Sequence, residues 1–195
     1  MEFLLEPFAF EFFRNGTLAA VLAGALCGMV GVYIVLRGMS YIGHGLSHAI
    51  FGGAVVSFVL EWNFYLGAGL WGFLAALLIN QTVRRTKIPA DAAIGVITTA
   101  SFAVGVALIS RYRGFTRSFD AALFGNILGV TSQDVWIVAG VGVAAAAAIF
   151  LLYKQLLFTT FDPEVAQVYG VRTEWIDTAF ALILASVLIV SMQIL

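Results

Sequence analysis

Apolar residues occur in long runs along the chain, and charged or turn-forming residues separate these runs. A helix needs about 20 residues to cross the ~30 Å hydrocarbon layer of a membrane, so each long run predicts a transmembrane span. The pattern therefore predicts an all-α fold, a polytopic transmembrane helical bundle of about six spans in one domain over residues 1–195. The predicted spans are residues 17–36, 42–60, 66–83, 91–110 and 135–153, and a last run from 178 that is still apolar at 195.

Two segments outside the spans are predicted to have structure of their own. Residues 1–14 combine phenylalanines with glutamates, which is typical of a short helix in the membrane interface, and we expect no cleavable leader there. Residues 115–134 are too polar and too often interrupted by glycine for a full span, so they predict a short helix or a re-entrant piece.

The composition supports a membrane protein and excludes several other functions. Hydrophobic residues make up 62% of the chain and charged residues 11%, whereas soluble domains have about 45–50% and about 25%. The lone Cys27 excludes an intramolecular disulfide and a cysteine metal cluster. No Gly-x-x-x-x-Gly-Lys-Ser/Thr phosphate loop occurs, so the chain does not hydrolyse ATP by that route, and a net charge of -1 gives no indication of nucleic-acid binding.

The distribution of Lys and Arg predicts the orientation in the membrane. Positive residues are more frequent in cytoplasmic loops, and six of them fall on one side of the predicted spans against four on the other. We therefore expect the side with six to face the cytoplasm. The six are Arg37, Arg84, Arg85, Lys87, Lys154 and Arg172, and the four are Arg14, Arg111, Arg113 and Arg117.

The only two histidines, His44 and His48, stand one helical turn apart in the second predicted span. Residues four apart share one face of a helix, so the two imidazoles could offer two nitrogens to one metal ion. Ionisable residues inside a membrane are costly to keep and usually mark a substrate or ion pathway. Two nitrogens are too few for a closed structural zinc site, which takes about four ligands, so the pair predicts a transient site for zinc, manganese or iron.

Two other interpretations of the histidines stay open at this point. Each imidazole could hydrogen-bond a backbone carbonyl or Ser47 and serve only for packing. A membrane metalloprotease would need an acid beside the first histidine, and Gly45 stands there instead.

Residues 154–170, between the fifth and sixth predicted spans, have the sequence of a capped helix rather than of a flexible linker. Asp162 can cap a helix, Pro163 suits the first helical position, Glu164 suits the positive end of the helix dipole, and Gly170 can end the helix. The segment predicts a short capped helix on the cytoplasmic side. It would either receive a push from a soluble partner or lie on the surface with no mechanical role.

Four stretches of the chain have sequences typical of one transporter family. They are residues 35–49 (Val-Leu-Arg-Gly-Met-Ser-Tyr-Ile-Gly-His-Gly-Leu-Ser-His-Ala), 91–96 (Asp-Ala-Ala-Ile-Gly-Val), 123–128 (Leu-Phe-Gly-Asn-Ile-Leu), and 161–164 (Phe-Asp-Pro-Glu) with Ala166 and Gly170. On these stretches the chain resembles the membrane subunits of bacterial zinc/manganese/iron ABC importers. The likeness extends from the first span to the end of the chain and keeps the family's order and spacing.

The resemblance implies roles for specific residues. The family motif in the second span commonly reads Gly-Asp-Ala-Leu-Ser-His-Ala, so His48 matches the histidine of the metal-facing pair and His44 replaces the acid. Losing that carboxylate removes a hard oxygen ligand and weakens the expectation of manganese over zinc. The implied helix that meets the ATPase includes Phe161, Asp162, Pro163, Glu164, Ala166 and Gly170, and the implied outer-face motif near a docked binding protein is Leu123, Phe124, Gly125 and Asn126.

The function implied by the resemblance is that of a permease subunit, not an enzyme, in an ATP-driven importer of zinc or manganese, with iron as a third candidate. We expect a separate ATPase chain, an extracytoplasmic metal-binding protein, a homodimeric assembly, a surround of membrane lipid and no nucleic acid, in the bacterial plasma membrane. The metal ion is the cargo, and no permanently bound cofactor is expected. Family members continue through further spans, so C-terminal spans of this single permease domain are expected to be missing. The alternatives are a transporter or channel for another solute, with structural histidines, and an assembly protein without a pathway.

Overall fold

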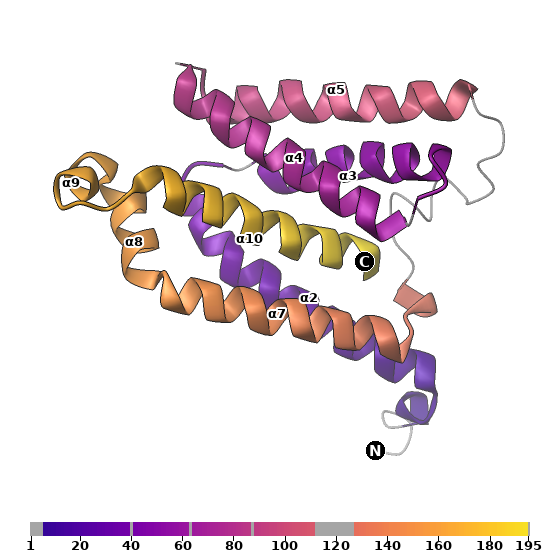
Figure 1. The fold of residues 1–195 in the computed structure, drawn as a ribbon. Coiled ribbons are helices and arrows are strands. Elements are labelled where there is room, and N and C mark those ends of the chain that lie inside the picture. Colours follow the sequence, from indigo (N-terminus) through magenta and orange to yellow (C-terminus); the bar gives the residue numbers. More distant parts are fainter. Residues whose placement is uncertain (1–5, 40, 63, 87, 112–126, 195) are drawn as a thin grey trace.

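The computed structural model describes residues 6–39, 41–62, 64–86, 88–111 and 127–194 of the chain. All regular secondary structure within these ranges is helical (Figure 1). The helices are η1 (Glu6–Ala9), α2 (Glu11–Leu36), α3 (Ile42–Val59), α4 (Phe64–Arg85), α5 (Ala90–Arg111), η2 (Ile127–Gly129), α7 (Ser132–Leu151), α8 (Tyr153–Phe161), α9 (Pro163–Val168) and α10 (Thr173–Ile194).

Six of these helices, α2, α3, α4, α5, α7 and α10, are long and apolar enough to cross a membrane. They run side by side in alternating directions, so successive turns lie at opposite ends of the bundle (Figure 1). This arrangement confirms the predicted all-α, polytopic bundle of about six spans. The protein is therefore a multi-pass membrane protein.

The first and last spans begin earlier than their apolar runs predict. The first, α2, begins at Glu11 rather than near residue 17, and η1 is only a short 3-10 turn. A helix of 26 residues is about 39 Å long, so its charged first turn extends beyond the ~30 Å hydrocarbon layer. The last, α10, begins at Thr173 rather than near 178, because its acidic first turns have cationic partners that a hydropathy pattern does not reveal.

The predicted helix or re-entrant piece at 115–134 is described only in its last part. There η2 is followed by α7, which begins with a capping box. In it the Thr131 hydroxyl accepts a hydrogen bond from the Asp134 backbone N–H, and the Asp134 carboxylate accepts one from the Thr131 backbone N–H.

The most buried of the six spans is α3. In the apolar part of α3, 61% of the residues are buried, against 17–44% in the other five spans. Close packing against α5 depends on two glycines: a Cβ added at Gly52 would collide with the Ser101 carbonyl oxygen, and one added at Gly105 would lie 2.9 Å from the Gly52 Cα. Small residues of this kind let helix backbones approach in lipid, where ordinary hydrophobic association is absent.

One end of the bundle carries the turn after α2, the end of α4, the start of α5, and both short helices α8 and α9 (Figure 1). We call it the α9 end. Five of the six positive residues predicted to be cytoplasmic lie there, and the sixth, Lys87, falls outside the described residues. At the opposite end Arg14 and Arg111 are described, and Arg113 and Arg117 are not. The cytoplasmic location of the α9 end stays a prediction.

The close contact between α3 and α5 generates a prediction about stability. Gly52→Ala should lower the free energy of unfolding by about 1–3 kcal/mol, because the added methyl group overpacks a backbone contact. Gly95→Ala on α5 is the matched control, since a Cβ there meets no atom within 4 Å. Thermal unfolding of the purified protein in detergent measures both. Equal melting temperatures for the two variants would show that the contact contributes nothing.

Candidate functional site

The two histidines lie on the first two turns of α3 and face one another. Their Nε2 atoms are 3.1 Å apart, and their rings meet edge to face with centroids 4.5 Å apart. Two nitrogens that bind one tetrahedral zinc ion at ~2.0–2.1 Å would lie about 3.3 Å apart. The observed separation therefore suits a shared metal ion with little movement of either side chain.

The surroundings of the pair favour this mutual contact over bonds to the backbone. The Ser47 hydroxyl donates to the His44 backbone carbonyl oxygen at 2.7 Å, so it is occupied by the helix itself. The Nδ1 atom of His48 is shielded from solvent and has no hydrogen-bond partner among the described residues. The His48 ring also contacts Phe102 of α5, with centroids 4.9 Å apart, and the Tyr41 ring lies 6.4 Å from that of His44.

The pair is open on one side of the single chain. His44 is exposed and His48 is half-buried, whereas the neighbouring Gly45 packs tightly against Ile94 and Thr98 of α5. Within the described ranges no group of three or more His, Cys, Asp or Glu residues is placed to hold a metal ion. The described part of the chain thus offers two imidazole nitrogens to one ion.

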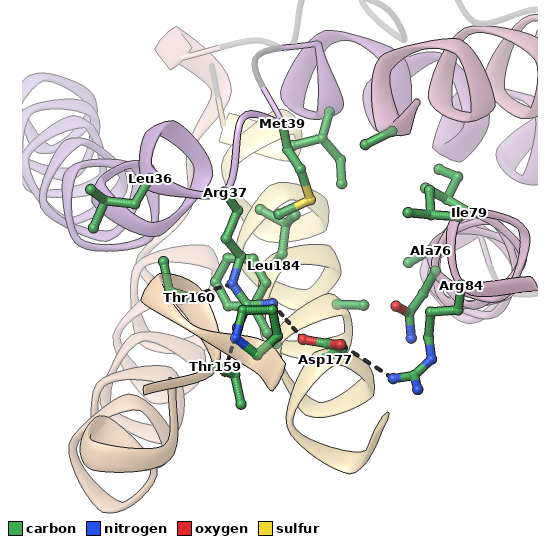
Figure 2. A pocket seen from close by; sticks show the side chains of 17 residues that line it. Leu36, Arg37, Met39, Ala76, Ile79, Arg84, Thr159, Thr160, Asp177 and Leu184 are labelled. Atoms are coloured by element: carbon green, nitrogen blue, oxygen red, sulfur yellow. Dashed lines mark hydrogen bonds and ion pairs between the residues drawn. The ribbon is translucent and has the colours of Figure 1, made fainter. Parts of the chain in front are cut away.

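A second polar cluster, at the α9 end, was not predicted from the sequence. Its members are Arg37, Arg84, Glu174 and Asp177, which we call the arginine cluster. Figure 2 shows three of them, Arg37, Arg84 and Asp177. One oxygen of the Asp177 carboxylate accepts from Arg37 at 2.8 Å and the other accepts from Arg84 at 3.2 Å. Arg84 also donates to Glu174 at 2.8 Å. The two positive and two negative charges balance, so the cluster is not an anion site.

Arg37 makes further contacts beyond its ion pair. Its Nε donates to the Thr160 hydroxyl and its Nη2 to the Thr159 hydroxyl, both at 3.1 Å, and its guanidinium carbon lies 4.6 Å from the centre of the Phe180 ring. Only 12% of the Arg37 side chain is exposed. The sequence offered one indication of such a partner: two acids, Glu174 and Asp177, stand three residues apart at the start of an apolar span.

The arginine cluster borders a cavity of about 400 Å³ between α2, α3, α4, α8 and α10 (Figure 2). Most of its lining is apolar, and neither histidine contributes to it. The apolar lining includes Leu36, Met39, Ile79 and Leu184.

The predicted capped helix in residues 154–170 is present, but it is interrupted. The chain forms α8 up to Phe161, turns at Asp162, and forms the short α9 with Pro163 as its first residue. The Asp162 side chain caps α9 by accepting from the Val165 backbone N–H at 2.9 Å. Gly170 follows with φ +81°, a left-handed conformation that favours glycine.

The surface of α9 and its flanks exposes several large apolar side chains, while Ala166 is buried against the bundle, Gln167 donates to Thr173 of α10 and the Tyr169 ring contacts Phe158 of α8. Ala166 is fully buried and Glu164 is exposed. Phe161, Val168 and Tyr169 are 68%, 85% and 77% exposed. Of the predicted outer-face motif, Leu123, Phe124, Gly125 and Asn126 all lie outside the described residues.

Comparison with known proteins gives consistent results. Residues 9–195 match the model of the ABC 3 transport family. The manganese import system permease protein ScaB of Streptococcus parasanguinis is 41% identical over 184 residues, which are 94% of this chain and 65% of ScaB. The manganese transport system membrane protein MntC of Halalkalibacterium halodurans is 35% identical over 191 residues, 98% of this chain and 65% of MntC. This chain therefore spans just under two thirds of the length of these relatives.

The fold has a counterpart among solved structures. PsaBC from Streptococcus pneumoniae, in complex with Fab, superposes with a TM-score of 0.81 and 36% sequence identity, covering 98% of this chain and 69% of that chain. The family expected from the sequence is thereby confirmed, as is a multi-pass protein of the bacterial inner membrane. The six-span helical bundle, the family match over residues 9–195 and the likeness to ScaB, MntC and PsaBC together show that the chain belongs to the ABC 3 transport family.

Proposed function

We propose that this chain is the membrane permease subunit of an ATP-binding-cassette importer, with a divalent transition metal ion as its cargo. The observation that carries the proposal is the pair of imidazole nitrogens, 3.1 Å apart on the most buried span. The relatives named as manganese permeases support the same class of cargo. ATP hydrolysis belongs to a separate chain, and an extracytoplasmic binding protein supplies the ion.

The ligand chemistry limits which ion the pair holds. Neutral imidazole suits zinc and also binds manganese and iron, whereas carboxylate oxygen suits manganese. At position 44 this chain has histidine where the family commonly has an acid. Its two ligands are therefore both imidazole nitrogens, which are softer than a carboxylate oxygen and carry no negative charge. We infer that zinc competes with manganese more strongly here than at a site with the family's acid.

We further propose that two copies of the chain form the pathway. Two imidazoles leave about two positions free on a tetrahedral ion, and His44 is exposed on a single copy. A second copy facing the first across His44 would supply two more nitrogens. Water fills the same positions when only one pair is engaged.

We propose that α9 is the helix on which the ATPase acts. Its apolar, exposed surface suits a protein contact, because large exposed apolar groups at Val168 and Tyr169 are costly in water. Its cap and the buried Ala166 hold it as one rigid piece, so a push on its surface moves the whole helix. The exposed Phe161 immediately precedes the cap.

Metal uptake by the complete transporter in proteoliposomes tests the proposed function. His44→Ala and His48→Ala should each reduce ATP-driven uptake of manganese or zinc about tenfold or more, a change of about 1.4 kcal/mol or more in binding of the ion. Ser47→Ala is the matched control, because its hydroxyl bonds only its own helix. Unchanged uptake in the double histidine variant would exclude the pair from the pathway, and wild-type transport of another solute alone would assign a different cargo.

Metal binding can be measured without transport. Zinc at one hundred times its dissociation constant should stabilise the purified protein by about 2.7 kcal/mol, because a ligand that binds only the folded state raises its stability. The shift in melting temperature should vanish in the variant that lacks both histidines. A shift of the same size in that variant would place the metal elsewhere on the protein.

The cap of α9 gives a prediction about ATPase binding. Asp162→Ala removes the bond to the Val165 N–H and should destabilise the start of the helix by about 0.5–2 kcal/mol, whereas Asp162→Asn keeps an acceptor oxygen. We expect the alanine variant to retain less ATPase on co-purification and the asparagine variant to match the wild type. Equal retention by all three proteins would show that the cap has no part in docking.

A further inference from the structure

We propose that Arg37 is a positioning residue that links the α8–α9 segment to the turn between α2 and α3, and so carries movement of α9 to the helix that bears the histidines. The inference rests on the proposed function in one respect, since it takes α9 as the helix on which the ATPase acts. The link through Arg37 gives that movement a route to the histidines.

The first part of the link is the contact with α8. Thr159 and Thr160 are in the last turn of α8, and their hydroxyls accept from two different nitrogens of Arg37 at 3.1 Å. Each hydroxyl also donates to the Leu156 carbonyl oxygen of its own helix. The two acceptors are therefore fixed to α8, and α9 follows them directly, with Asp162 as its cap and Pro163 as its first residue.

The second part of the link is covalent. Arg37 is the C-cap residue directly after α2, and its backbone N–H donates to the Tyr33 carbonyl oxygen at 2.9 Å. Gly38 then turns the chain with φ +65°, and α3 begins at Ile42. His44 follows within the first turn of α3. A displacement of Arg37 thus reaches the histidine helix through one short turn.

The third part is the anchor on α10. Asp177 accepts from Arg37 at 2.8 Å and from Arg84 of α4 at 3.2 Å, while the Phe180 ring packs against the Arg37 guanidinium (Figure 2). Arg37 is consequently held between α8 on one side and α10 on the other. When α8 moves relative to α10, the guanidinium is the group that must follow one of them.

Only arginine can make all of these contacts at once. A guanidinium has five N–H donors in a fixed plane, and here three different nitrogens serve three acceptors on two helices. A lysine has one nitrogen, so it would keep the charge near Asp177 but not both threonine contacts. Replacing Arg37 by lysine therefore weakens the contact with α8 while the ion pair with Asp177 remains.

The test cuts the link at α8 and leaves the ion pair in place. In the complete transporter, Thr159→Val with Thr160→Val removes the two acceptors at nearly constant volume. Thr178→Val is the matched control, since its hydroxyl accepts from Asn80 of α4 and donates to the Glu174 backbone carbonyl of its own helix, and neither bond involves Arg37. We expect the double variant to hydrolyse ATP within about twofold of the wild type while the metal imported per ATP falls at least fivefold. A ratio equal to that of the control would overturn the proposal.

A second measurement does not depend on the cargo. Hydrogen exchange of the backbone amides at residues 37–42 should change when a non-hydrolysable ATP analogue binds the wild-type complex, and the change should be lost in the double variant but kept in the control. If the wild type imports no metal but shows this response, the proposed metal cargo is wrong and the proposed role of Arg37 stands. If the wild type imports metal and hydrogen exchange at residues 37–42 does not change, the proposed role of Arg37 is wrong and the proposed metal cargo stands.

A second substitution tests the same link if the double valine variant is unstable. Should the double valine variant melt well below the Thr178→Val control, Arg37→Lys replaces it, because the lysine keeps its charge beside Asp177. A fall in metal imported per ATP in Arg37→Lys supports the link, and a wild-type ratio overturns it.

Discussion

Hydrocarbon offers no hydrogen bonds, so every backbone N–H and C=O that this chain places in the bilayer must be bonded inside the protein. Helices meet that requirement within each segment, and three hydroxyls that are buried or half-buried on α3 and α5 are satisfied in the same way. Ser57, Thr98 and Ser101 each donate to the carbonyl oxygen four residues earlier, at 2.9, 2.7 and 2.9 Å. Polar groups that cannot be satisfied in this way are therefore confined to a few places.

Those places divide the molecule into two kinds of polar site. In the arginine cluster the charges neutralise one another, with Arg37 and Arg84 sharing Asp177, so the cost of removing them from water is offset by pairing. The histidine pair is different, since each Nε2 has only the other as its partner and the His48 Nδ1 has none among the described residues. One site is complete within the chain, and the other still has capacity to bind.

Much of this arrangement follows from local sequence. The spans are predictable because apolar runs of about 20 residues have few alternatives in a membrane, and the shared face of His44 and His48 follows from their spacing of four. The cap of α9 is predictable for the same local reason, because Asp162 and Pro163 each act on the next few residues.

The parts that could not be predicted depend on which distant segments meet. Arg37 and Asp177 are 140 residues apart along the chain, and no local pattern pairs them. The early start of α10 has the same origin, since its acidic first turns are stabilised by arginines from α2 and α4. The sequence also did not predict that α8 ends directly before α9. A capping residue such as Asp162 indicates that a helix begins, but it does not indicate that another helix ends at the preceding residue.

The glycine contact between α3 and α5 restricts how the bundle can deform. Where backbones touch without side chains between them, a shift along the axis would drive Cβ atoms of the next turn into the opposite helix. The two helices are thereby locked in register and rotate or translate as one body. Phe102 then stays beside His48 for as long as this glycine contact is intact, so one wall of the histidine site keeps its shape while the opposite, open side is free to change.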